Sequence, residues 1–463
     1  MGPKSAVAQA DLDHMMGGMN SGAMAKQSGD AMVVNIEAKD GPGGLGVELT
    51  PRVGLNTRQA RSDSVTVQIA TSRFERQKVG GFLTVNTAAV APTESFRRRN
   101  SRKTGDNDGG DGRGSPPPQT EDAIEAGLAF LARFQKEDGR WSLQDFGEEA
   151  GLQADTAATA LALLSFQGAG YHHREHQYKD VVRRGLEFLV RNQKDDGDLF
   201  LPLDDDSNRS VWLYSHSIAT LALCEAYGMT QDPNLKEPAQ KALDFIIAAQ
   251  HKERGGWRYS PGVGSDTSVT GWMMMALKSG ELAELKVPKQ TYDKIKVWLN
   301  ASQESPQKPY LYRYNPYAPD TEEQRHGRAT SKTMTTVGLL MRLYTGWKRD
   351  NPNMTAGAGY LKENLPQLGT AREPLRDTYY WYYGTQVMFH MGGEYWAAWN
   401  GRLHPLLIES QQKAGPLAGS WNPRGGVPDR WAPHAGRLYV TTMNLLCLEV
   451  YYRHLPLYDD TAK

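Results

Sequence analysis

Three Asp-Thr pairs recur at equal intervals in this chain, and they are its clearest candidates for chemistry. The interval is 111 residues each time, and the pairs are Asp155-Thr156, Asp266-Thr267 and Asp377-Thr378. A buried carboxylate can act as a general acid or base, because burial shifts its pKa toward neutrality. An Asp directly before a helix can instead cap the free N–H groups of the first turn. The pairs therefore predict either cavity-facing acids or helix caps.

A histidine occupies the equivalent position in a neighbouring segment. His216, in VWLYSHSIAT, lies where the Asp-Thr pairs lie in the segments around it. A lone His is usually structural, but beside a carboxylate its ring can carry a proton. The approach to Asp266, GGWRYSPGVGSD, is rich in glycine. We therefore take Asp266 as the candidate acid or base, in one polar cluster with His216, and Asp155 and Asp377 as supporting residues.

Aromatic side chains crowd the same positions. Their faces can stabilise a cation, stack on a sugar or pack in the core. The five successive aromatic residues from Tyr379 cannot share one helix face, because successive residues turn through ~100°. Some of them must therefore pack outward. The candidate ligand-binding residues are Trp212, Tyr214, Tyr259, Trp272, Tyr379, Tyr380 and Trp381.

Helical repeats must position these side chains. Apolar residues recur at three- and four-residue steps in AIEAGLAFLARFQ, VVRRGLEFLVRNQ, PAQKALDFIIAAQ and TYDKIKVWLNASQ. Each of these four segments ends in Gln and is followed by a second helical segment. Two further units begin at GAGYLKENLP and LHPLLIESQQ, so six helical hairpins span residues 120–458. One hairpin cannot bury both of its faces, so neighbours must stack. The pattern predicts an all-α domain whose six hairpins close into a ring.

The turns after the Gln residues carry a resemblance to a known family. Gln-x-x-Asp-Gly-x-Trp at residues 135–141, with variants that begin at Gln193, Gln250 and Gln411, resembles the QW repeat of squalene and oxidosqualene cyclases. The paired helices are similar to the (α/α)6 toroid of those cyclases and of the β subunits of protein prenyltransferases. The resemblance implies six inner and six outer helices around a cavity that binds a hydrophobic, isoprenoid ligand.

The catalytic motifs of these families are incomplete in this chain. Class II cyclases carry Asp-x-Asp-Asp-Thr, whose middle Asp protonates an alkene, and the acid position here holds Ala154, Ser265 or Arg376. Prenyltransferases bind zinc through Asp, Cys and His, and here Ser268 replaces the Cys. The sequence therefore predicts no cofactor. It leaves open a cyclase or transferase, a non-catalytic binding or scaffold protein, and a carbohydrate-active (α/α)6 enzyme.

Two other clusters contain possible metal ligands. The motif His-His-Arg-Glu-His at residues 172–176 lies in the polar stretch GAGYHHREHQY between two predicted helices, and we interpret it as a solvated loop. The acidic run 204–206 lacks the spacing of a calcium loop and is interpreted as a surface loop. We therefore predict no metal site. Cys224 and Cys447 are predicted to be buried free thiols.

The first quarter of the chain differs in composition. Residues 1–30 are predicted to be disordered, residues 31–99 to form a small β-rich module of unknown partner, and residues 100–119 to be a disordered linker. The formal net charge is zero, with 53 basic and 53 acidic residues, which argues against nucleic acid. The basic run 97–103 leaves peripheral membrane contact open. No signal peptide or membrane span is predicted, and the compartment is unassigned.

Overall fold

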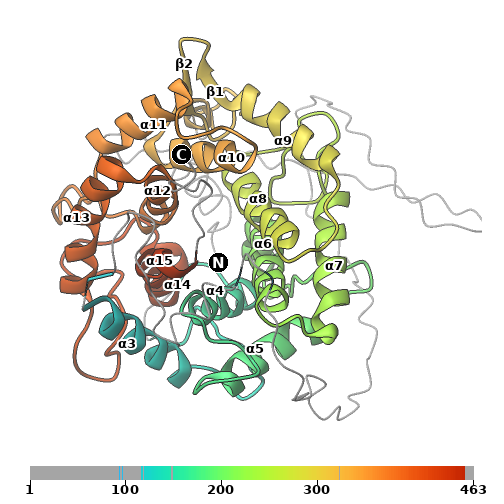
Figure 1. Cartoon of the computed structure of the whole chain (residues 1–463), viewed down its shortest axis with the longest axis vertical. Coiled ribbons are helices and arrows are strands. Elements are labelled where there is room, and N and C mark those ends of the chain that lie inside the picture. Colours follow the sequence, from blue (N-terminus) through green and yellow to red (C-terminus); the bar gives the residue numbers. More distant parts are fainter. Residues whose placement is uncertain are drawn as a thin grey trace, which may run out of the picture. The chain divides into compact units, whose positions relative to one another are not determined.

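In the computed structural model, six helical hairpins are arranged as a ring (Figure 1). The structure describes Thr93, Phe96 and residues 116–117, 119–146, 150–322 and 324–453. The inner helices are α4 (Asp155–Gly168), α6 (Asp205–Thr230), α8 (Thr267–Leu282), α10 (Lys332–Tyr344), α12 (Thr378–Met391) and α14 (Ala432–Leu448). The outer helices are α3 (Gln119–Arg133), α5 (Lys179–Arg191), α7 (Pro233–Ala248), α9 (Lys289–Ser302), α11 (Pro352–Glu363) and α13 (Gly393–Ser410).

The ring closes between the last hairpin and the first. Each inner helix packs against the next, α14 packs against α4, and α13 packs against α3. A short helix, α15 (Val450–Arg453), follows α14. The predicted all-α toroid of six hairpins is therefore confirmed. Within the described part of the chain, no helix combines the length and the apolar character that a membrane span requires.

Most of the predicted N-terminal organisation lies outside the described residues. Of the predicted β-rich module, the structure describes Thr93 and Phe96. The Thr93 N–H donates to the Gly228 carbonyl of α6 at 3.0 Å, and Phe96 is buried. Both cysteines are buried and free, as predicted.

A turn that recurs in four of the six hairpins fastens each of these hairpins to the next. Gln135 Nε2 donates to the Gly139 carbonyl and to the Val181 carbonyl of α5, both at 2.9 Å. The equivalent Gln residues of three further turns make the same two bonds, toward α7, α9 and α3. The bond to α3 is part of the ring closure. We call these segments the Gln–Trp turns, and they comprise residues 135–141, 193–199, 250–257 and 411–421.

Each Gln–Trp turn contains a glycine with a positive φ. These glycines have φ values of 76° to 94°. A Cβ at each would lie 2.0 to 2.2 Å from a backbone carbonyl oxygen of the neighbouring outer helix. Both the backbone conformation and the close approach therefore require glycine. The four residues are Gly139, Gly197, Gly255 and Gly419.

The Trp of a turn is bound by both helices of its hairpin. Trp257 Nε1 donates to a carbonyl of α7 at 2.8 Å, and its backbone N–H donates to Thr270 Oγ1 of α8 at 3.1 Å. Trp141 and Trp421 make the same two kinds of bond. The Trp therefore fills the gap between the helices and satisfies its own polar groups.

Two predicted loops have regular structure instead. The segment QESPQKPYLY, which begins at the Gln that ends the fourth repeated segment, forms an antiparallel pair of strands, β1 (Gln303–Ser305) and β2 (Lys308–Tyr312). The Tyr312 N–H donates to Thr335 Oγ1 at 3.3 Å, where three of the Gln–Trp turns have a Trp. The acidic run 204–206 is a helix start rather than a surface loop. Asp204 caps α6 by accepting the Ser207 N–H at 2.9 Å.

Candidate functional site

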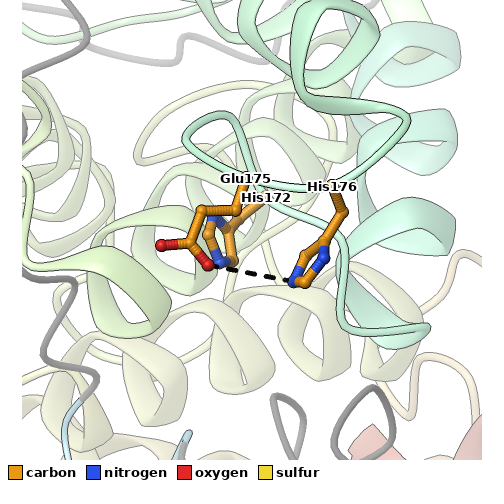
Figure 2. A group of neighbouring side chains, drawn as sticks. All are labelled: His172, Glu175 and His176. Carbon is orange, nitrogen blue, oxygen red and sulfur yellow. Dashed lines mark ion pairs between the residues drawn. The ribbon is translucent and has the colours of Figure 1, made fainter.

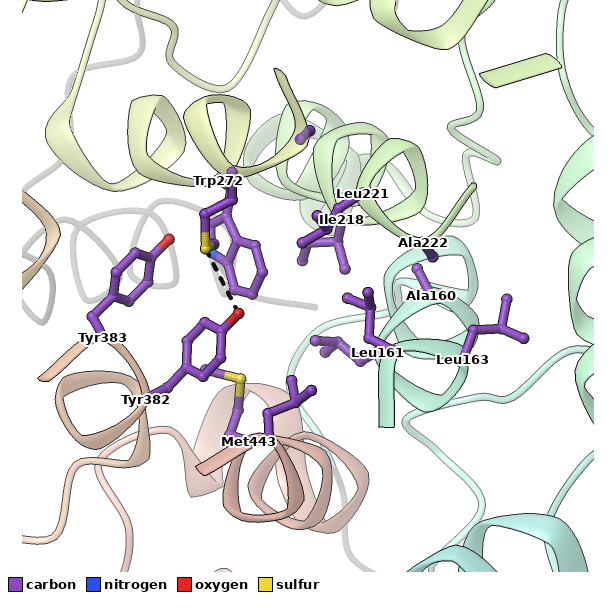
Figure 3. Packing of buried hydrophobic residues seen from close by; sticks show 14 of the residues in the cluster. Ala160, Leu161, Leu163, Ile218, Leu221, Ala222, Trp272, Tyr382, Tyr383 and Met443 are labelled. Atoms are coloured by element: carbon purple, nitrogen blue, oxygen red, sulfur yellow. Dashed lines mark hydrogen bonds between the residues drawn. The ribbon is translucent and has the colours of Figure 1, made fainter. Parts of the chain in front are cut away.

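A partly open cavity of about 100 Å³ lies among the N-terminal halves of five inner helices. Nearly all of the surface that faces it is apolar. Leu161, Ile218, Trp272 and Tyr382 project toward one another from α4, α6, α8 and α12 (Figure 3). The aromatic part of the cavity wall consists of Tyr214, Trp272, Tyr379, Trp431 and Tyr439.

The residue that faces the cavity is the second after each Asp of the Asp-Thr pairs. Ala157, Ser268 and Tyr379 all line the cavity, and Ser268 and Tyr379 keep the 111-residue interval. Two residues turn a helix through about 200°, so the Asp and the lining residue point to different sides. Equally spaced residues therefore do meet at one site, but they are Ala157, Ser268 and Tyr379 rather than the three Asp residues.

Two of the three Asp residues are helix caps. Asp266 Oδ1 accepts the Val269 N–H at 2.7 Å, and Asp377 Oδ1 accepts the Tyr380 N–H at 3.0 Å. Asp377 Oδ1 also accepts from Trp431 Nε1 at 3.1 Å, so it orients an indole of the cavity wall. Both carboxylates are buried, and neither lines the cavity.

Asp155 has a different role from the other two. It is the first residue of α4, which has no side-chain cap, and its Oδ2 lies 2.9 Å from Arg140 Nε. Burial raises the pKa of Asp155, while a hydrogen bond with Ser142 and the Arg140 charge act in the opposite direction. Asp155 therefore forms an ion pair with the first Gln–Trp turn instead of facing the cavity.

His216 is fully buried and belongs to the second Gln–Trp turn. Its Nδ1 accepts the Leu199 N–H at 3.1 Å. In the third turn, the equivalent bond from the Trp257 N–H is accepted by Thr270 Oγ1. Its Nε2 lies 3.1 Å from the Ala242 carbonyl of α7, and its ring packs on Phe245. Asp198 Oδ1 lies 3.2 Å from Nδ1. These contacts direct the ring toward α7, and His216 does not line the cavity.

Three hydroxyl groups at the cavity satisfy one another. Tyr214 OH donates to Ser268 Oγ at 2.7 Å, and Tyr379 OH lies 2.7 Å from the same Oγ. Burial raises the pKa of both phenols, so they stay protonated. The buried Ser215 Oγ, which also lines the cavity, has no hydrogen-bond partner among the described residues, but the surface that faces the cavity is almost entirely apolar, which favours apolar groups in a ligand.

The other aromatic candidates lie away from the cavity. Tyr380 OH donates to the Asn364 carbonyl at 2.6 Å, which confirms that part of the aromatic run packs outward. Trp212 Nε1 donates to Asp198 at 3.1 Å. Tyr259 OH lies 2.6 Å from another phenol, and Trp381 is buried.

Two aromatic residues of the wall were missed from the sequence. Trp431 and Tyr439 lie on either side of a kink in α14 at Gly436, whose φ is 62°. The kink brings the turn before it to the cavity. The available signals were Pro433 in the first turn of the helix and Gly436 within it.

A further buried carboxylate, Asp429, lies behind this wall. It accepts the Trp431 N–H at 2.9 Å and the Thr378 N–H at 3.1 Å. Burial raises the pKa of Asp429 to about 6, although the Arg376 guanidinium 3.7 Å away opposes the shift. This carboxyl group exchanges its proton near neutral pH, but it does not line the cavity.

Comparisons with known sequences find a similarity over part of the chain. No protein-family model matches the chain. A lanosterol synthase of Aspergillus fumigatus is 29% identical over 141 residues, which cover 29% of this chain and 17% of that protein. The chain thus matches less than a fifth of the length of this curated relative.

Solved structures cover most of both chains. An alpha-amylase from Clostridium perfringens has a TM-score of 0.50 at 12% identity, covering 73% of this chain and 99% of that one. A cellobiose 2-epimerase from Bacillus thermoamylovorans has the same TM-score and identity over 72% and 98%. The type II terpene cyclase MstE from Scytonema has a TM-score of 0.48 at 15% identity over 74% and 100%. The chain has the α/α-toroid fold.

Proposed function

We propose that this toroid binds an apolar, isoprenoid-type ligand in its central cavity. The observation that carries the proposal is an almost wholly apolar cavity surface, on which the hydroxyls of Tyr214, Ser268 and Tyr379 pair with one another. Burying apolar surface contributes about 25 cal/mol per Å². A sugar hydroxyl without a partner would instead cost about 1–3 kcal/mol. Among the described residues, no carboxylate lines the cavity, whereas glycoside hydrolysis needs two.

The free volume indicates which part of a ligand enters. About 100 Å³ is less than the ~150 Å³ of an engineered cavity that binds benzene. The space therefore suits one branched end of about five carbons rather than a folded polyene. The remainder of a longer chain would extend through the open side.

The geometry supports binding without cyclisation. Ala154 lines the cavity at a position where the cyclase motif would place its acid. The three Asp residues of the repeat are occupied by an ion pair or by helix caps. Because a general acid must reach the reacting atom, none of them is placed to protonate a ligand in this arrangement.

Ligand binding is testable through the indoles of the wall. Squalene, geranylgeraniol and cellobiose are titrated while Trp fluorescence is recorded, since Trp272 and Trp431 line the cavity. We expect a saturable change with the isoprenoids and none with the sugar. Ala157→Trp fills the cavity and should weaken binding at least tenfold, about 1.4 kcal/mol. Ala397→Trp, on an exposed position of α13, is the matched control.

Two outcomes of these experiments would contradict the proposal. Equal isoprenoid binding by wild type and Ala157→Trp would overturn the assignment to this cavity. A cyclised product of squalene, detected by mass spectrometry after incubation, would contradict the absence of cyclisation.

A further inference from the structure

Two histidines and a glutamate gather beyond the C-terminal end of α4, in the loop that leads to α5. His172, Glu175 and His176 each offer one ligand atom, and these atoms lie within 4.8 Å of one another. Figure 2 shows their side chains together on this one loop. The cavity is lined by the other end of α4, so this cluster is separate from the proposed ligand site.

We propose that this loop binds a divalent transition-metal ion, best matched by zinc, through His172, Glu175 and His176. Two imidazoles and one carboxylate form a recurring zinc ligand set, in which water completes a tetrahedron. Imidazole nitrogen also excludes magnesium and calcium as preferred ions, because they select oxygen ligands.

The distances require only a small closure. Glu175 Oε2 lies 4.0 Å from His176 Nε2, and the two imidazole centroids are 5.7 Å apart at 65°. Two ligands of a tetrahedral zinc with bonds near 2.0–2.1 Å lie about 3.4 Å apart. Both Glu175 and His176 are exposed or half-exposed at the side chain, so rotation about their side-chain bonds can supply the difference.

The neighbouring residues fix the loop from one side. Asp232, the cap of α7, is fully buried and lies 2.8 Å from His173 Nε2 and 3.3 Å from Arg174 Nη2. His173 and Arg174 are therefore occupied in anchoring the loop to α7. The residues before and after them, His172 and Glu175, belong to the cluster.

Tyrosines fix the two ends of the loop. Tyr171 and Tyr178 pack edge to face with centroids 4.8 Å apart. Tyr171 OH donates to Glu125 of α3 at 2.8 Å, and Gln177 Nε2 donates to the same hydroxyl at 2.9 Å. The segment between them is thus held in place before any ion binds, which reduces the ordering that binding requires.

The backbone directs His176 into the cluster. Its φ is 71°, a left-handed backbone conformation that residues other than glycine rarely adopt. In Figure 2 its ring faces His172 and Glu175, and the dashed line joins it to Glu175. Strain of this kind is retained where the surrounding structure or a function requires it.

The solvated loop predicted from the sequence is wrong for two of its histidines. His172 is 2% exposed and His173 is 4% exposed. His172 therefore supplies a fixed, water-shielded ligand, and Glu175 and His176 supply the movable ones. The proposed ion would connect the buried and exposed parts of the loop and stabilise the α4–α5 connection.

The test uses the full chain, freed of metal with EDTA and titrated with zinc chloride by calorimetry. We expect wild type to bind one zinc ion at this loop. Glu175→Gln and His176→Gln should lose this binding event, or bind the ion about 100-fold more weakly than wild type. These variants change exposed ligands and leave buried His172 in place. His251→Gln, in the third Gln–Trp turn, is the matched control and should bind as wild type.

Thermal unfolding gives the second measurement. Zinc should raise the Tm of the wild type and of His251→Gln, but not of the two ligand variants, because an ion that binds the folded state stabilises it. Wild-type zinc binding in both ligand variants would overturn the proposal. An equal rise in Tm with magnesium would also overturn it, since this would reflect charge alone.

Discussion

The Gln–Trp turns and the cavity wall are built from one repeat, and they use it in opposite ways. In the turns, Gln makes the same two bonds and Gly the same close approach in all four copies. At the wall, equivalent positions hold Ala157, Ser268 and Tyr379. Repetition marks positions that have the same task in each hairpin with such a turn, which is to join neighbouring hairpins. Divergence marks positions that together shape one site, so the site is found where the repeat is broken.

The largest predicted effect follows from the repeated side of this comparison. Gly255→Ala places a Cβ 2.1 Å from the Lys294 carbonyl oxygen at a φ of 76°. Gly262→Ala has a similar φ of 69° but nothing within 4 Å. Urea unfolding should show a loss of about 3–5 kcal/mol for the first and about 1 kcal/mol for the second. Equal losses would mean that conformation alone, and not the close approach to α9, requires the glycine.

The second Gln–Trp turn departs from the repeat, although it does not form part of the cavity. Leu199 and His216 replace the Trp and Thr of the other turns. Leu199→Trp overfills the gap and His216→Thr empties it, each at a loss of about 2 kcal/mol. The double variant restores the combination found elsewhere and should be about 1–2 kcal/mol more stable than additivity predicts.

This double-mutant cycle also tests the role of His216. Additive losses would contradict the equivalence of His216 with the threonines. Ligand affinity should stay within twofold of wild type in His216→Thr, because its ring contacts α7 and not the cavity. A large loss of affinity at unchanged stability would restore His216 as a functional residue.

The fold was predictable because its determinants are local. Helical periodicity is visible along the segments and a terminal Gln in most of the outer-helix segments, and the Gly-Trp pattern shows where the chain must turn. The directions in which the side chains of Asp155, Asp266 and Asp377 point were not predictable to the same degree. One residue of difference in a helix start turns a side chain through ~100°. Asp155 lies inside its helix, while the other two precede theirs.

The missing part of the wall has a similar cause. Trp431 comes before the regular part of the last inner helix, and only the kink at Gly436 brings it beside Tyr439. A break in the periodicity of α14 therefore contributes two of the aromatic residues at the cavity. Periodicity predicts the scaffold well and is least informative at such breaks, which is where the candidate site lies.

The smallest predicted effect is electrostatic and concerns Asp429, which lies behind the cavity wall. The pKa of Asp429 is raised by burial from 3.8 to about 6. The folded protein therefore binds this proton more tightly than the unfolded chain does. The stabilisation that results is complete below pH ~4 and is lost as the pH rises through 6. Between pH 7 and pH 5 the wild type should gain about 1 kcal/mol relative to Asp429→Asn, which has no carboxyl to titrate. The pKa of Asp232 is about 2, so its titration falls outside this window.

Urea unfolding at several pH values measures this difference in slope. Gly262→Ala, a loop variant away from the wall, should keep the wild-type slope, because it removes no titrating group. Asp429 accepts backbone N–H groups of Thr378 and Trp431, and an Asn carbonyl oxygen can accept one of them. The slope, rather than the absolute stability, is therefore the informative quantity. The same slope in Asp429→Asn as in wild type would mean that water or a nearby charge keeps this carboxyl group ionised.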